Sequence, residues 1–76
     1  MVLERLKKVF KVLMPEVDTD KVTLDSELVS DLGISSISVL LIVIGIEEEF
    51  GITFDNVRAD TFKTVGDVVK YIEERL

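Results

Sequence analysis

Hydrophobic residues recur at helical spacing in the first part of the chain, with basic and polar residues between them. This period of three to four residues places the apolar side chains on one side of a helix. Their positions are Val2, Leu3, Leu6, Val9, Phe10 and Leu13. Pro15 has no backbone N–H and disfavours helical geometry in the residue before it. The pattern therefore predicts an amphipathic helix that ends near Leu13 or Met14.

Residues 15–35 lack such a period, and we interpret them as a long connector. A connector of this length usually has a function or forms short turns of its own. We expect one short helical turn within residues 26–33, and apolar side chains that hold the connector on the core. The expected anchors are Val17, Val22, Leu24, Leu28 and Leu32.

A second helix is predicted in the most apolar stretch of the chain. It begins at Ser35 or Ser36 and ends at Phe50, just before Gly51, which suits the left-handed position after a helix end. A helix that packs on a core needs an apolar stripe on one side only. Here the apolar residues from Ile37 onward go nearly all the way round, so we expect some of them to be exposed.

The last predicted helix starts at Thr64, where Thr64-Val65-Gly66-Asp67 resembles a capping box with Asp in the place of Glu. Its inner stripe is expected to be Val65, Val68, Val69, Ile72 and Leu76. One short helix is expected after Asp55. The predicted fold is all-α, a small bundle of three main helices plus one short helix, with a long loop between the first and second helices. Residues 1–76 are expected to form a single domain.

The composition excludes several classes of function. The chain has no cysteine and no histidine, which removes disulfides, thiolate metal sites and the commonest general base. We therefore expect no catalytic residue and no metal site, and the acids near Asp18 lack the oxygen ligand and the glycine that a calcium loop requires. The longest apolar run has eight residues, too few for a membrane span of about 20. No secretory signal is visible, so we expect a cytoplasmic protein.

Negative charge is concentrated in the middle of the chain. The net charge is −6, and residues 22–57 carry seven acidic residues and no basic one. A nucleic-acid partner would require a basic face, so we expect none. Two interpretations stay open for the acidic segment: a surface that attracts basic partner proteins, or a solvated face that keeps the chain in solution.

Two adjacent serines, Ser35 and Ser36, precede the most apolar helix. Either hydroxyl could cap the helix by accepting a hydrogen bond from a backbone N–H one turn inside. Capping explains one serine but not the pair, nor Gly33 two residues earlier. The first N–H groups of a helix also favour a phosphate, so a serine at this place could carry a phosphodiester.

The chain resembles the acyl carrier proteins of fatty-acid and polyketide synthesis. The resemblance is carried by Asp31-Leu32-Gly33-Ile34-Ser35-Ser36-Ile37 and by Glu47-Glu48-Glu49-Phe50-Gly51-Ile52, and it extends over essentially the whole chain. In that family the signature reads Asp-Leu-Gly, one variable residue, then Asp-Ser-Leu. The resemblance implies that Ser36 receives 4'-phosphopantetheine covalently from coenzyme A through a separate phosphopantetheinyl transferase. It also implies that the arm carries acyl groups as thioesters to acyl-transferring or ketosynthase-type enzymes, and that the chain is not itself an enzyme.

The differences from the family cluster beside Ser36. Ser35 replaces the usual Asp, and Ser38 and Leu41 occupy positions that are usually acidic. We therefore expect a specialised monomeric carrier that contacts its partners through Ile37 and Leu41. The acidic end of the same helix adds two expected partner contacts, Glu47 and Glu48.

Three other interpretations remain open. One is a peptidyl or aminoacyl carrier, and another is a carrier-like interaction module that has lost its arm. A small hydrolase that uses the serines is the third, although the sequence offers no evident base.

Overall fold

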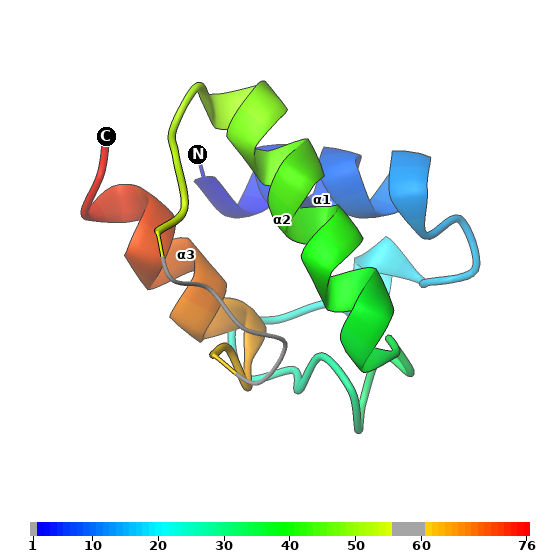
Figure 1. Cartoon of the computed structure of the whole chain (residues 1–76). Helices are drawn as coiled ribbons and strands as arrows, with labels where there is room; N and C mark the ends of the chain where they lie inside the picture. Colours follow the sequence, from blue (N-terminus) through cyan, green and yellow to red (C-terminus); the bar gives the residue numbers. More distant parts are fainter. Residues whose placement is uncertain (1, 56–60) are drawn as a thin grey trace.

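Three α-helices surround one hydrophobic core in the computed structural model, which describes residues 2–55 and 61–76 (Figure 1). They are α1 (Val2–Leu13), α2 (Ser36–Phe50) and α3 (Val65–Glu73), and a short 3₁₀-helix, η1 (Thr19–Lys21), follows α1. The all-α bundle and the long loop between α1 and α2 are confirmed. The short helix expected after Asp55 falls largely on residues 56–60, outside the described residues.

The helix ends follow the predicted signals. α1 ends at Leu13, and α2 ends at Phe50 with Gly51 in the left-handed conformation at φ 67°. At the start of α3 the Thr64 hydroxyl accepts from the N–H of Asp67, and the Asp67 carboxylate accepts from the N–H of Thr64. The predicted capping box is therefore present.

The core is apolar and continuous. Its fully buried side chains come from all three helices: Leu6, Phe10, Ile46, Val65 and Ile72. The burial predicted for two apolar residues, Leu24 and Leu76, was wrong. Leu76 follows the end of α3 and is 66% exposed, and Leu24 is 49% exposed because its backbone, rather than its side chain, meets α3.

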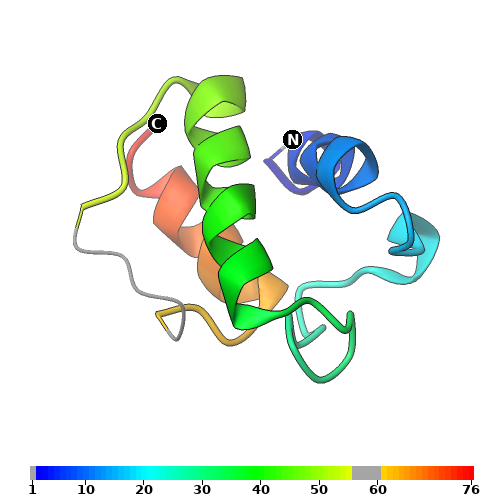
Figure 2. The same cartoon turned by 45° about the vertical axis from the view of Figure 1, so that its right-hand side comes forward.

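The long loop runs beneath the helices and brings the chain back to the start of α2, as Figure 2 shows. Buried Val22, Leu28 and Ile34 hold it against the core. Leu28 N–H donates to the carbonyl of Lys63 at 2.9 Å, and Val65 N–H donates to the carbonyl of Ser26 at 2.9 Å. These bonds fix the loop to the beginning of α3, and so position the segment that leads into α2.

Candidate functional site

Asp31 closes the turn that precedes α2. Its carboxylate accepts from the N–H of Glu27 at 2.8 Å, and its own N–H donates to the Glu27 carbonyl at 3.0 Å. The Gly33 N–H reaches the carbonyl of Val29 at 3.1 Å. The helical turn predicted within residues 26–33 is therefore present, and the acid of the motif stabilises it.

Gly33 turns the chain towards α2. It has φ 69°, a left-handed conformation that side chains other than glycine seldom adopt. The next residue, Ile34, is buried and its N–H donates to the carbonyl of Leu28 at 3.0 Å. With Ile34 anchored in the core, the chain emerges at the surface with Ser35 and Ser36 exposed.

Ser35 is the N-cap of α2. Its hydroxyl oxygen accepts from the N–H of Ser38 at 3.2 Å, and its hydroxyl donates to the Ser38 side-chain oxygen at 2.9 Å. The cap thus uses both the acceptor and the donor capacity of the Ser35 side chain. This arrangement explains one serine of the pair as a structural residue.

Ser36 is the first residue of α2, and its side chain is exposed. Within residues 2–55 and 61–76 its hydroxyl makes no hydrogen bond. The first N–H groups of α2 surround this position, and helix N-termini favour a phosphate group through these donors and the helix dipole. An exposed hydroxyl at such a place can accept a phosphodiester. No side-chain base contacts it in the described part of the chain.

Four apolar side chains of α2 point to solvent: Ile37, Leu40, Leu41 and Ile44. We call them the apolar stripe of α2. Ile37 is 77% exposed and Leu41, one helical turn further on, is 52% exposed. The expectation that part of this helix is exposed is confirmed, and the stripe begins directly beside Ser36.

The three glutamates at the end of α2 have different surroundings. The Glu47 carboxylate accepts from the N–H of Phe54 at 2.9 Å and so supports the chain that leaves the helix. Glu49 pairs with Arg5 at 3.0 Å, and Arg5 also donates to the Glu49 carbonyl at 2.7 Å. Glu48 is exposed and has no ion pair among the described residues. Sequence reasoning missed both roles. The Glu49 pair depends on a residue 44 positions away, and the Glu47 bond depends on how the chain turns back after Gly51.

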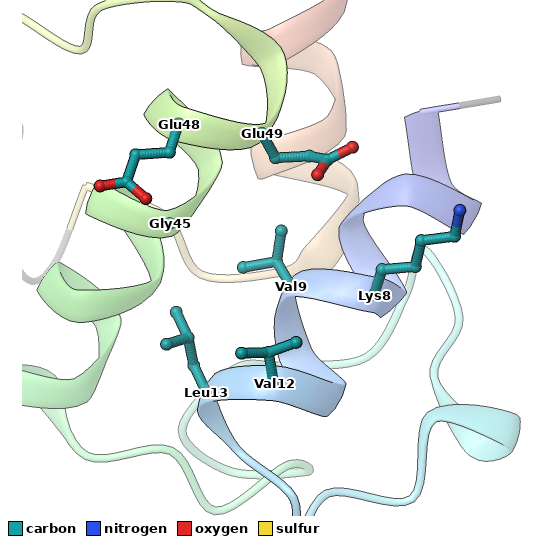
Figure 3. Close-up of a pocket in the computed structure, with 7 residues that line it drawn as sticks. All are labelled: Lys8, Val9, Val12, Leu13, Gly45, Glu48 and Glu49. Atoms are coloured by element: carbon teal, nitrogen blue, oxygen red, sulfur yellow. The ribbon is translucent and has the colours of Figure 1, made fainter.

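An open groove of about 290 Å³ separates α1 from the second half of α2 (Figure 3). Its apolar lining comes from Val9, Val12 and Leu13 of α1, and Gly45 forms its α2 side. The charged residues that line it are Lys8, Glu48 and Glu49. A Cβ at Gly45 would lie 2.7 Å from the end of the Leu13 side chain, so the glycine allows the two helices to approach closely here.

Two further classes of site receive no support from the described residues. No group of His, Cys, Asp or Glu in residues 2–55 and 61–76 could hold a metal ion. No helix in the same ranges is long and apolar enough to cross a membrane.

Comparison with known proteins identifies the family. Residues 2–72 match the model of the phosphopantetheine attachment site. A curated relative, the acyl carrier protein of Helicobacter acinonychis (strain Sheeba), is 47% identical over 58 residues, which cover 76% of this chain and 74% of the relative. The free serine at the start of α2 agrees with such a match. The chain belongs to the acyl carrier proteins, whose cofactor is covalently attached 4'-phosphopantetheine.

Proposed function

We propose that Ser36 is the residue that carries the phosphopantetheine arm, and that the arm presents acyl groups to partner enzymes as thioesters. The observation that supports this proposal is the difference between the two serines. Ser35 makes two hydrogen bonds as the helix cap, whereas the Ser36 hydroxyl is exposed and makes none within the described residues. Only Ser36 can be modified without opening the cap.

The chemistry needs one nucleophilic oxygen from this chain. The Ser36 oxygen forms a bond to the phosphorus next to pantetheine in coenzyme A, and the P–O bond of the pyrophosphate breaks. Adenosine 3',5'-bisphosphate leaves, and the hydroxyl proton passes to a base of the transferase. The bound group supplies a thiol that this cysteine-free chain lacks. The chain's own part is to hold the oxygen at the surface, where an enzyme can reach it.

The bounds of the carrier domain and its location in the cell belong to the same proposal. Residues 1–76 act as one carrier domain, supported by the family match over residues 2–72 and by the continuous core. The chain acts as a carrier rather than as a catalyst. A cytoplasmic location is part of the proposal and agrees with the absence of cysteine.

The partner surface that we propose combines Ile37 and Leu41 with the acidic end of α2. Burying one such aliphatic side chain in a partner is worth about 1.5–3 kcal/mol. An exposed ion pair contributes about 0–1 kcal/mol. Apolar contacts beside Ser36 can therefore replace one or two ion pairs. Glu48 is free to meet a cation of a partner, whereas Glu47 would first have to release the N–H of Phe54.

Mass spectrometry of the intact protein tests the attachment residue. Incubation with coenzyme A and a broad-specificity phosphopantetheinyl transferase should add one phosphopantetheine to the wild type, and Ser36→Ala should abolish the addition. Ser35→Ala is the matched control: it should still be modified, with a loss of about 0.5–2 kcal/mol in stability from the missing cap. Modification that persists in Ser36→Ala would move the site to another residue. A wild type that no transferase modifies would indicate an interaction module without an arm.

A further inference from the structure

A second exposed apolar surface lies across the groove between α1 and α2. It consists of Val12 and Leu13, which line the groove on α1, and of Leu41 and Ile44, which are exposed on α2 one helical turn before the groove-lining residues Gly45 and Glu48. We call it the two-helix face. Val12 is 79% exposed, the highest fraction among the large apolar side chains of the described chain. An apolar side chain this exposed at the rim of an apolar groove suggests a surface that another molecule covers.

Opposite charges border the two-helix face on its two sides. Lys8 lies four residues before Val12 on α1, so the two residues share one side of the helix. Glu48 lies one turn beyond Ile44 on α2. Neither of these two charges has an ion pair within residues 2–55 and 61–76. A free cation therefore lies on the α1 side, and a free carboxylate lies on the α2 side.

Lys8 and Glu48 both line the groove, Lys8 from α1 and Glu48 from α2 (Figure 3). A surface with a cation on one side, a carboxylate on the other and an apolar centre is complementary to its own copy. A two-fold axis parallel to the groove would bring α1 of one copy against α2 of the other. Lys8 of each copy would then meet Glu48 of the other, around a centre of apolar contacts. An axis across the groove would instead bring like charges together.

We propose that two copies of the chain associate through the two-helix face, around a two-fold axis parallel to the groove. Such a contact is isologous, and every favourable pair in it occurs twice. This inference goes beyond the carrier function and does not depend on it.

The size of the face determines how tight this dimer is. A fully exposed aliphatic side chain has on the order of 100 Å² of accessible apolar surface. With the exposed fractions of Val12, Leu13, Leu41 and Ile44, the two-helix face therefore offers roughly 200 Å² of apolar surface per copy. Even with a charged border of similar area, two copies bury roughly 800 Å² in total, about half of a standard interface. The dimer should therefore form at roughly hundreds of micromolar, and the chain should be monomeric at micromolar concentrations.

Dimerisation leaves the attachment serine free. Ser36 and Gly45 are nine residues apart, or two and a half helical turns, so they lie on opposite sides of α2. The groove lies beside Gly45, and Ser36 therefore faces away from the second copy. Leu41 belongs both to the two-helix face and to the proposed partner surface, so the dimer and a partner would compete for it.

Sedimentation velocity on the holo-protein, kept reduced so that arm thiols cannot cross-link, measures the association. From about 20 μM to about 1 mM the average mass should rise from one chain towards two, and NMR shifts should change with concentration at Val12, Leu13, Leu41 and Ile44. Because each charge contact occurs twice, Lys8→Glu and Glu48→Lys should each raise the dissociation constant at least about tenfold. The double variant Lys8→Glu/Glu48→Lys should dimerise again. An equimolar mixture of the two single variants should form a heterodimer, because every contact in it then joins opposite charges.

Lys63→Glu is the matched control, with the same change of charge on an exposed residue outside the face, and it should dimerise like the wild type. A mass of one chain throughout the concentration range would overturn the proposal. Dimers that are insensitive to both single charge reversals would also overturn it. Phosphopantetheine loading of the wild type and of Lys8→Glu is measured in parallel. If the wild type dimerises but accepts no phosphopantetheine, only the carrier proposal is contradicted. If it accepts phosphopantetheine but stays monomeric at every concentration, only the dimer proposal is contradicted.

Discussion

Gly66, the second residue of α3, is a position where the usual effect of a glycine substitution should be reversed. Replacing a glycine inside a helix with alanine normally stabilises the protein by about 1 kcal/mol, because alanine loses less backbone entropy on folding. Here a Cβ would lie 2.9 Å from the carbonyl oxygen of Leu24. That same oxygen accepts from the Gly66 N–H at 2.8 Å. The added methyl group therefore pushes against the acceptor of the residue's own hydrogen bond.

The loop cannot easily move away from the new methyl group. Two further bonds, from Val65 N–H to Ser26 and from Leu28 N–H to Lys63, hold it against the start of α3. Crowding of a packed contact costs about 1–3 kcal/mol, and the weakened hydrogen bond adds about 0.5–1.5 kcal/mol. After the helix gain of about 1 kcal/mol is subtracted, Gly66→Ala should destabilise the chain by roughly 0.5–3.5 kcal/mol.

Thermal and urea unfolding followed by circular dichroism measure this effect. For a domain of this size each kcal/mol of lost stability lowers Tm by roughly 4–8 °C. Gly45→Ala is the matched control, since its new methyl group meets only side-chain atoms, the flexible end of the partly exposed Leu13 and a methyl group of Val9, and no backbone carbonyl. We expect that variant to stay within about 0.5 kcal/mol of the wild type, because the helix gain and the small shift of its neighbours nearly cancel. A Gly66→Ala chain as stable as the wild type would show that the loop adjusts freely and that the reasoning is wrong.

Two further predictions concern charge. Backbone N–H groups of Thr64 and Lys63 donate to the Asp67 carboxylate and lower its pKa. Because the folded pKa is then below the unfolded one, this stabilisation is present at neutral pH and is lost as the pH falls through the folded value. Asp67→Asn should therefore be less stable than the wild type at pH 7, and the difference in stability should be smaller near pH 3. Thermal melts of both proteins at the two pH values measure this. An equal difference in stability at both pH values would contradict the prediction. Ser35→Asp with Leu41→Glu restores acids beside the attachment site, so turnover of the holo-protein by a general ketosynthase should rise and turnover by its own partner should fall. A wild type that already serves the general enzyme as well as an ordinary acyl carrier would refute the specialisation.

Local signals predicted the helices well, because each helix end is encoded within a few residues. Pro15, Gly51 and the Thr64 capping box act on their own neighbours, and the structure places the helix ends where these residues indicate. The burial of isolated apolar residues was harder to predict. Leu24 and Leu76 are apolar, as core residues usually are. Their exposure depends on how the loop and the end of the chain meet α3.

The candidate site was predictable as a short motif, whereas its surroundings were not. The residues themselves indicated Ser35 and Ser36 as a pair, and the family resemblance pointed to Ser36 as the modified one. The hydrogen bonds of Ser35 add a structural distinction between the capping residue and the free hydroxyl. The pairing of Glu49 with Arg5 joins residues 44 positions apart, and no local sequence pattern predicts it. The groove at Gly45 likewise depends on the approach of two helices, so it became visible only in three dimensions.

The cap at the start of α2 also affects how partner enzymes could tell an empty carrier from a loaded one. The hydrogen bonds that begin the helix belong to Ser35 and Ser38, and they remain whether or not the neighbouring hydroxyl is esterified. If Ser36 is the attachment residue, as we propose, attachment of the arm leaves the helix start in place. Enzymes would then meet the same protein surface in both states and could sense the difference only through the arm and its cargo. An unloaded chain would therefore occupy the same docking sites as a loaded one, and the ratio of the two forms in the cell would set the rate of any pathway that they supply.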